Sequence, residues 1–139
     1  MISKMLENVR KNCPLIHNIT NYVTVNDVAN ALLASGGSPI MSDEPDDVSD
    51  ITSICGGLNI NIGTLNKNSI EAMFISGKKS KELGHIVLLD PVGAGASKLF
   101  RYVNAEMVGD EVRSNPFGTM GYAIADPFTF ILGTKDNDY

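Results

Sequence analysis

The sequence predicts an α/β protein with a mostly parallel sheet and helices on both faces of that sheet. Segments with apolar residues at helical spacing alternate with short apolar segments along roughly the first two thirds of the chain. Glycine or proline separates most of these segments, as expected for helix ends and turns. Alternation of this kind favours neighbouring parallel strands joined by right-handed crossovers. The chain has 139 residues, 43% hydrophobic and 19% charged, which fits one ordinary globular domain.

Apolar periodicity predicts four helices in this region. Asn26 or Asp27 is the expected N-cap of the second helix, and acids in the stretch 43–47 are expected in the first turn of the third. Asn66 or Asn68 is expected to cap the fourth helix, and glycines at 36–37, 56–57 and 84 are expected to end the last three. The expected helices are Ile2–Asn12 and three segments whose buried faces carry, in turn, Val28 to Leu33, then Val48, Ile51, Ile54 and Cys55, then Ile70, Met73, Phe74 and Leu83.

Short apolar segments between these helices predict four strands. The third alternates apolar residues with Asn59 and Asn61, so one face is apolar and the other carries amides. The fourth is apolar throughout and runs directly into Asp90. The expected strands are Leu15–Ile19, Pro39–Met41, Leu58–Ile62 and Ile86–Leu89.

The regular pattern decays after Ser97. Phe100, Val103 and Met107 fit one more helix; a turn follows at 114–118, then candidate strands at 122–125 and 128–132 and a solvated end at 135–138. We therefore expect residues 1–99 to form the N-terminal part of the domain and residues 100–139 to be a divergent or truncated tail. The sheet is expected to be incomplete for the same reason.

Charge and cysteine usage exclude several classes of partner. The net charge is −5 with no basic block, which argues against nucleic acid and anionic membranes as partners. Uncharged runs such as Cys13 to Asn26 are too short to span a bilayer, and the N-terminus has no apolar signal core. Cys13 and Cys55 lack metal-ligand spacing and are expected to be free thiols in a reducing, cytoplasmic setting.

The turn that follows the fourth strand is the first candidate site. Asp90 stands at the strand end, where it could hold Mg²⁺, and Gly93 and Gly95 allow a phosphate to approach the backbone amides. The alternative is a plain connection in which the glycines serve the turn and Asp90 caps amides. On this stretch alone the plain connection is favoured, because a lone G-x-G is a weak signal.

Polar residues also follow the other three strands, and parallel pairing would bring all four groups to one edge. Thr20 and Asn21 follow the first strand, Ser42 and Asp43 follow Met41 at the end of the second, and Gly63 and Thr64 follow the third. Met41 could pack against a flat ring or simply fill the core, and core filling is the usual role of a single Met. His17 is expected to be a hydrogen-bonded core histidine rather than a general base.

Two common catalytic signatures are not readable in this sequence. No nucleophile–base triad can be assigned, and nothing matches the Walker A pattern G-x-x-x-x-G-K-[ST]. The catalytic residues therefore stay unassigned.

Five sequence blocks, spread over about the first hundred residues, form a recognisable series. They are PLIHNITNYVT at 14–24 followed by Asn26-Asp27, ANALLA at 29–34, SPIM at 38–41, NIGTLN at 61–66 and LDPVGAGA at 89–96. In this order and spacing the chain resembles the hydroxyethylthiazole kinases. The resemblance implies a ribokinase-like α/β fold, a homotrimer with sites at subunit interfaces, and a kinase that uses ATP and Mg²⁺. The implied substrate is the alcohol of 4-methyl-5-(2-hydroxyethyl)thiazole, in thiamine biosynthesis or salvage.

The resemblance also implies roles for individual residues. Met41 falls on the thiazole contact, and Thr20, Asn21 and Gly63 fall at the substrate pocket. Asp90 falls near the metal and phosphates, and the turn with Gly93 and Gly95 falls at the phosphates. These roles are expectations carried over from the family.

The resemblance ends near Phe100. The family's later segments contact ATP and supply an anion hole with a cysteine, and neither Cys13 nor Cys55 is placed to replace it. Two alternatives therefore stay open beside the kinase. One is a catalytically inactive half that only binds the thiazole alcohol, and the other is an unrelated nucleotide-binding α/β domain that uses the stretch 90–97.

Overall fold

A computed structural model of the chain describes residues 2–93, 95–108 and 131–132. Its sheet has the strand order β2-β1-β3-β4-β5, in which the first four strands are parallel and β5 pairs antiparallel with β4. The α/β class and the mostly parallel sheet are therefore confirmed. The strands are β1 Leu15–Ile19, β2 Ser38–Met41, β3 Gly57–Asn61, β4 Ile86–Asp90 and β5 Ile131–Leu132.

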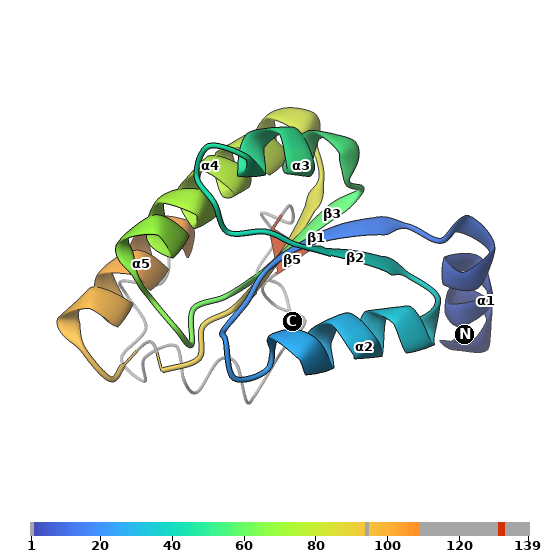
Figure 1. Cartoon of the computed structure of the whole chain (residues 1–139), viewed down its shortest axis with the longest axis horizontal. Helices are drawn as coiled ribbons and strands as arrows, with labels where there is room; N and C mark the ends of the chain where they lie inside the picture. The colour runs from blue at the N-terminus through green and yellow to red at the C-terminus, as the bar shows by residue number, and fades with distance from the viewer. Residues whose placement is uncertain (1, 94, 109–130, 133–139) are drawn as a thin grey trace, which may run out of the picture.

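Helices lie on both sides of the sheet, as predicted (Figure 1). The helices α3, α4 and α5 cover one face, whereas α2 lies on the other face with α1 against its end. In order, the helices are α1 Ile2–Asn12, α2 Val25–Ser35, α3 Val48–Ile54, α4 Lys67–Leu83 and α5 Lys98–Val108. No helix within the described ranges has the length and apolar character needed to cross a membrane.

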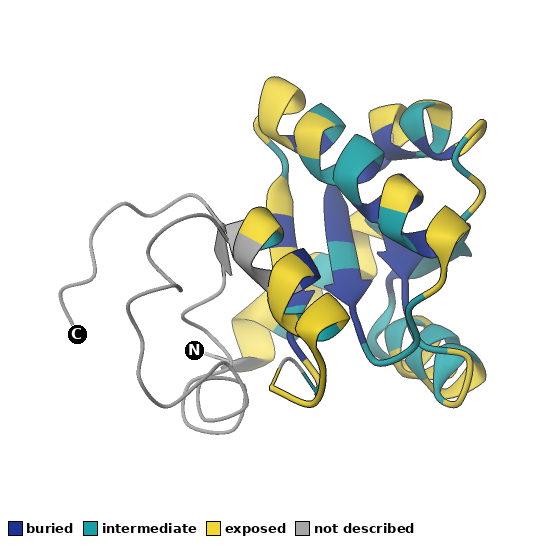
Figure 2. Ribbon diagram, turned by 90° about the vertical axis from the view of Figure 1, so that its left-hand side faces the viewer, coloured by how far each residue is buried: buried dark blue, intermediate teal, exposed yellow. Residues whose placement is uncertain are grey.

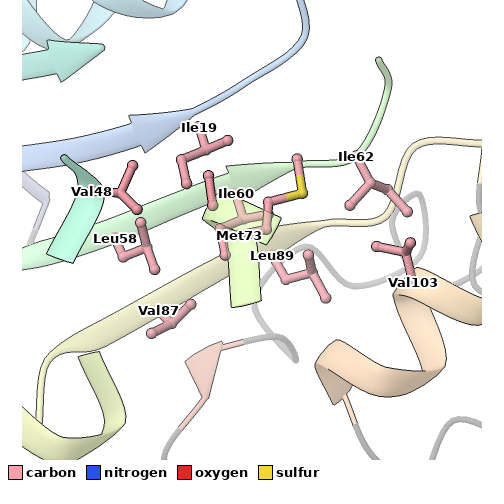
Figure 3. Close-up of a cluster of buried hydrophobic side chains, with 10 residues drawn as sticks. Ile19, Val48, Leu58, Ile60, Ile62, Met73, Val87, Leu89 and Val103 are labelled. Atoms are coloured by element: carbon pink, nitrogen blue, oxygen red, sulfur yellow. The ribbon is translucent and has the colours of Figure 1, made fainter. Parts of the chain in front are cut away.

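The hydrophobic core lies between the sheet and the layer formed by α3, α4 and α5 (Figure 3). Alternate residues of β3 and β4 point to this side, where Leu58, Ile60, Val87 and Leu89 are buried. Asn59, Ile86 and Leu88, which alternate with them, are partly or largely exposed. Met73 of α4 is fully buried among them. The contrast between the buried strands and the exposed outer sides of the helices is visible in Figure 2.

The opposite face of the sheet is only partly covered. Ile86 and Leu88 of β4 are 62% and 41% exposed on this face, although the sequence of β4 is apolar throughout. Beside them, α2 and the sheet form an open groove of about 460 Å³. Helix α2 has no fully buried residue, so it packs on the sheet less tightly than α4 does.

Two helix starts differ from the sequence-based expectation. The N-cap of α2 is Thr24 rather than Asn26 or Asp27, because the Asn21 side chain forms the turn before the helix. Asn21 Oδ1 accepts hydrogen bonds from the amides of Val23 and Thr24, both at 3.1 Å. Helix α3 begins only at Val48, so the acids at 43–47 precede the helix instead of lying in its first turn.

The expected buried faces also need correction at three positions. Leu33, Ile54 and Leu83 are 58%, 64% and 44% exposed, because each lies in the last turn of its helix. The polar Thr52 is fully buried in α3 instead. Helix α3 ends at an extended Cys55 rather than at the glycine pair, since Gly57 already belongs to β3. Cys13 and Cys55 are free thiols, as expected.

Part of the tail prediction falls on described residues. Helix α5 confirms the helix expected around Phe100, and β5 lies within the strand expected at 128–132. The turn at 114–118, the strand at 122–125 and the solvated end at 135–138 lie outside the described residues. Helix α5 crosses the proposed boundary between residues 99 and 100, and the division of the chain stays a prediction.

Asn66 rather than Asn68 caps α4. Its Oδ1 accepts the Ser69 amide at 2.9 Å, while Ser69 Oγ accepts the Asn66 amide at 3.0 Å, which is a reciprocal capping box. Helix α4 is the longest described helix and supplies Met73 to the core, so its first turn also matters for packing.

We expect Asn66→Ala to lower the free energy of unfolding by about 1 kcal/mol, because the helix loses its cap. Urea titration followed by circular dichroism measures this change, since the chain has no Trp. Asn68→Ala is the matched control: Asn68 is exposed inside the first turn and caps nothing. Equal losses in the two variants would contradict the assignment.

Candidate functional site

The carboxyl ends of the four parallel strands meet at one edge of the sheet, which is where open α/β sheets bind ligands. The register pairs Met41 of β2 with Asn18 of β1, and Asn61 of β3 with Asp90 of β4. The register places Met41 level with Leu88, so Asp90 lies three strand spacings across the sheet and two residues further along, about 16 Å away in all. A small molecule with a ring at one end and a reacting group at the other can span part of that distance.

Side-chain amides connect three of these strand ends. Asn21 Nδ2, after β1, donates to Asn61 Oδ1 at 3.0 Å, and Asn61 Nδ2 donates to Asp90 Oδ2 at 2.7 Å. The Gly63 amide also donates to Asn61 Oδ1, at 2.8 Å. Asn61 is 8% exposed, so these bonds are sheltered from competing water. The amide row therefore fixes the orientation of the Asp90 carboxyl group.

Burial raises the pKa of Asp90 above the ordinary value for Asp, and the hydrogen bond from Asn61 opposes this shift in part. Burial penalises the ionised form, so a nearby cation would stabilise it. Among the described residues, no group of three or more His, Cys, Asp or Glu side chains could hold a metal ion. Asp90 alone fits Mg²⁺ in the manner of nucleotide sites, where one or two carboxylates, water and phosphates share the ion.

Gly63 is constrained by the same amide row. A Cβ at position 63 would lie 2.9 Å from Asn61 Oδ1 and 3.2 Å from Asn21 Nδ2. The structure thus gives Gly63 a definite role: it leaves the space in which the two asparagine side chains meet. Thr20, next to Asn21, is 9% exposed, and its Oγ1 has no hydrogen-bond partner among the described residues. Such a hydroxyl is costly unless a ligand or water satisfies it.

The turn after β4 leads into the N-terminus of α5. Gly93 has φ +70°, a conformation that favours glycine, and its carbonyl accepts the Ala96 amide at 2.8 Å. Ser97 Oγ accepts the Phe100 amide at 3.3 Å and so caps the helix. No atom of the described residues lies within 4 Å of a Cβ added at Gly95, so the contacts of that part of the chain do not require glycine there.

Two features near the site were missed in the sequence. Arg101 Nη1 donates to the Gly95 carbonyl at 3.1 Å, which brings a cation to the glycine turn. In the sequence, Arg101 was marked only as a basic residue one turn into the helix after the glycines.

Tyr22 is the second feature. Its OH donates to Asp43 Oδ2 at 2.8 Å and accepts from Asn66 Nδ2 at 3.2 Å, and the bond to Asp43 raises the pKa of Tyr22.

The Tyr22 contacts join the loops after β1, β2 and β3. They connect residues 21 and 44 positions apart, so no local pattern in the sequence could reveal them. His17, by contrast, is a buried and hydrogen-bonded histidine as predicted, with ring nitrogens 2.9 Å from Thr52 Oγ1 and 2.9 Å from the Ser42 carbonyl.

The fold defines an open, mostly parallel α/β protein, and polar side chains gather at the carboxyl ends of its strands, where proteins of this class bind ligands. Comparison with known proteins makes the assignment specific. The sequence profile described as the hydroxyethylthiazole kinase family matches residues 6–115. The chain belongs to the hydroxyethylthiazole kinase family.

Individual relatives agree with this assignment. The chain is 61% identical over 113 residues to a hydroxyethylthiazole kinase of Clostridium acetobutylicum, a match that covers 81% of this chain and 41% of the relative. It is 62% identical over 98 residues to one of Ruminiclostridium cellulolyticum, covering 70% of this chain and 36% of the relative. The chain thus spans about two fifths of the length of these curated relatives.

A solved structure supports the fold. The hydroxyethylthiazole kinase protein of Pyrococcus horikoshii OT3 superposes with a TM-score of 0.73 at 41% identity. The superposition covers 76% of this chain and 41% of that chain. The ribokinase-like fold that the resemblance implied is consistent with this match.

We expect Gly63→Ala to lower the free energy of unfolding by about 1–3 kcal/mol, because the new Cβ must displace a sheltered asparagine side chain. Urea titration measures the loss. Gly56→Ala is the control, since the nearest atom to its added Cβ is the Leu15 carbonyl at 3.9 Å. A Gly63 variant as stable as the Gly56 variant would show that the amide row adapts freely.

Asp90→Asn is expected to raise the free energy of unfolding at neutral pH. The folded-state pKa of Asp90 is raised, so the protonated carboxyl group stabilises the fold. This contribution to the free energy of unfolding is complete below about pH 4, the ordinary pKa of Asp. That contribution is lost as the pH rises through the folded-state pKa. The variant does not titrate, and its stability advantage should therefore shrink on acidification.

Urea titrations at neutral pH and below pH 4 measure this difference. Asp46→Asn is the control, because it makes the same charge change on an exposed side chain. An advantage of Asp90→Asn that is the same at both pH values would contradict the expected linkage.

Proposed function

We propose that this chain takes part in the ATP-dependent phosphorylation of the alcohol of 4-methyl-5-(2-hydroxyethyl)thiazole, in thiamine biosynthesis or salvage. Its family membership supports the reaction class, and relatives that bear the kinase name are 61% and 62% identical to it. The observation that carries the proposal is the position of Asp90. It is oriented by Asn61 and lies directly before the glycine turn that leads into α5.

The thiazole end of the substrate is assigned to the side of the site near β2 and β1. Met41 offers a soft thioether to the ring, and Asn21, Thr20 and Gly63 line the space beside it. The buried Thr20 hydroxyl, which finds no partner in the part of the chain that the structure describes, supports a polar ligand group at this position. A ring near Met41 would leave the hydroxyethyl arm pointing along the edge toward Asp90.

The phosphate end is assigned to the turn after β4. The turn containing Gly93 and Gly95 precedes the N-terminus of α5, where free amides and the helix dipole favour anions. Arg101 adds a positive charge beside Gly95. Mg²⁺ held by Asp90 would neutralise charge on the transferred phosphoryl group, which is the main requirement of such transfers.

The wider biological setting belongs to the same proposal. A homotrimer with sites between subunits and a cytoplasmic location follow from the family resemblance. The small-molecule substrate is supported by the family, and the low net charge without basic blocks fits the absence of a nucleic-acid or membrane partner.

The test is phosphotransfer by the purified 139-residue chain with Mg–ATP and the thiazole alcohol, with the phosphorylated product quantified by mass spectrometry. We expect product above background, and its loss in Asp90→Asn. Binding of the alcohol alone, measured by calorimetry, should weaken about tenfold or more in Met41→Asp, because the variant buries a charge against the ring.

The outcomes separate the candidate functions. Binding without product would overturn phosphorylation by this chain and favour a module that only binds the thiazole alcohol. ATP binding that is lost when both Gly93 and Gly95 are replaced by Val, with no effect of thiazole, would favour an unrelated nucleotide-binding domain. If the chain shows neither binding of the alcohol nor product, the proposal is overturned entirely.

A further inference from the structure

His17 connects the centre of the sheet to the turn that follows β2. The residue is fully buried on β1, and its two ring nitrogens contact different parts of the fold. Nε2 lies 2.9 Å from the backbone carbonyl of Ser42, and Nδ1 lies 2.9 Å from Thr52 Oγ1 in α3. One ring therefore bridges the turn after β2 and the first helix beyond it.

The chemistry of the partners fixes which nitrogen carries the proton. A carbonyl oxygen only accepts, so Nε2 must donate to Ser42. Burial lowers the pKa of His17 and favours the neutral ring, in which Nδ1 then accepts from the Thr52 hydroxyl. That hydroxyl also lies 2.7 Å from the Val48 carbonyl, so its single proton has two competing acceptors. The bond from Nε2 to Ser42 has no such competition.

The turn after β2 needs an anchor of this kind. Strand β2 is at the edge of the described sheet and pairs only with β1 there. Ser42 directly follows Met41, the last residue of β2, and lies beyond the paired register. On the outer side, Tyr22 holds Asp43 through an exposed hydrogen bond, which solvent weakens. The buried His17 contact is the inner attachment of the same turn.

We propose that His17 is a positioning residue whose Nε2–H holds the Ser42 carbonyl and thereby sets where Met41 stands at the carboxyl edge of the sheet. His17 acts through Ser42 and does not touch the substrate. The inference rests on the proposed function in one respect, which is that Met41 contacts the thiazole ring. A purely structural histidine would stabilise the fold without any selective effect on the turn.

Two amide variants separate these roles because each keeps a donor near only one of the ring nitrogens. The Gln amide reaches about as far as Nε2, and the Asn amide about as far as Nδ1. We expect His17→Gln to retain the Ser42 bond and His17→Asn to lose it. Thr52→Val is the matched control, since it removes the partner of Nδ1 and leaves the Ser42 contact in place.

The first readout needs no ligand. In protein labelled with ¹³C at the methionine methyl groups, the Met41 resonance is assigned with Met41→Leu. We expect that resonance to move in His17→Asn and to keep its wild-type position in His17→Gln and Thr52→Val. The ¹⁵N shifts of the wild-type ring should also report the tautomer protonated at Nε2, a result that does not require any variant to fold.

The second readout is calorimetric binding of the thiazole alcohol. We expect His17→Asn to weaken binding about tenfold, as the loss of one buried hydrogen bond would. His17→Gln and Thr52→Val should stay within about threefold of wild type. Identical behaviour of the Asn and Gln variants, or a wild-type ring protonated at Nδ1, would overturn the proposal. If the methyl shifts follow the expected pattern but wild type binds no thiazole alcohol, positioning stands and the proposed function fails.

Discussion

The candidate site depends on the row of side-chain hydrogen bonds from Asn21 through Asn61 to Asp90. Parallel pairing alone brings the strand ends to one edge, but it does not orient their side chains. The row does so, because each asparagine amide donates to the next acceptor in sequence across β1, β3 and β4. Asn21 also forms the turn before α2, so one side chain contributes both to the fold and to the site.

Much of the fold was predictable because its signals are local. The alternation of helical and strand periods gave nine of the ten described elements nearly at their observed positions, and part of the tenth, β5, within a longer expected strand. The errors fall where tertiary structure competes with propensity. Thr24 displaces Asn26 and Asp27 as the cap because a preceding side chain closes the turn, and Ile54 is exposed because its helix ends there. A pattern of residue types does not contain that information.

For the site, the sequence predicted which residues lie at the strand ends but not how their side chains interact. The strand-end rule correctly indicated that Asp90, Asn21 and Gly63 would share one edge, and the structure brings them together. It could not show that Gly63 leaves space for the asparagines, that Arg101 reaches Gly95, or that Tyr22 joins three loops. Each of these depends on contacts between segments or on one side chain's reach. The functional roles themselves come from the family and remain proposals.

The crowding around Gly63 also bears on how such a site can change during evolution. Positions 21, 61 and 63 share one small volume, since a Cβ at Gly63 would clash with Asn61 Oδ1 and lie in tight contact with Asn21. A larger residue at 63 is accommodated more easily after Asn61 has become smaller, and that change would remove the hydrogen bond that orients Asp90. The order in which substitutions occur is therefore restricted, and we expect the three positions to change together during evolution.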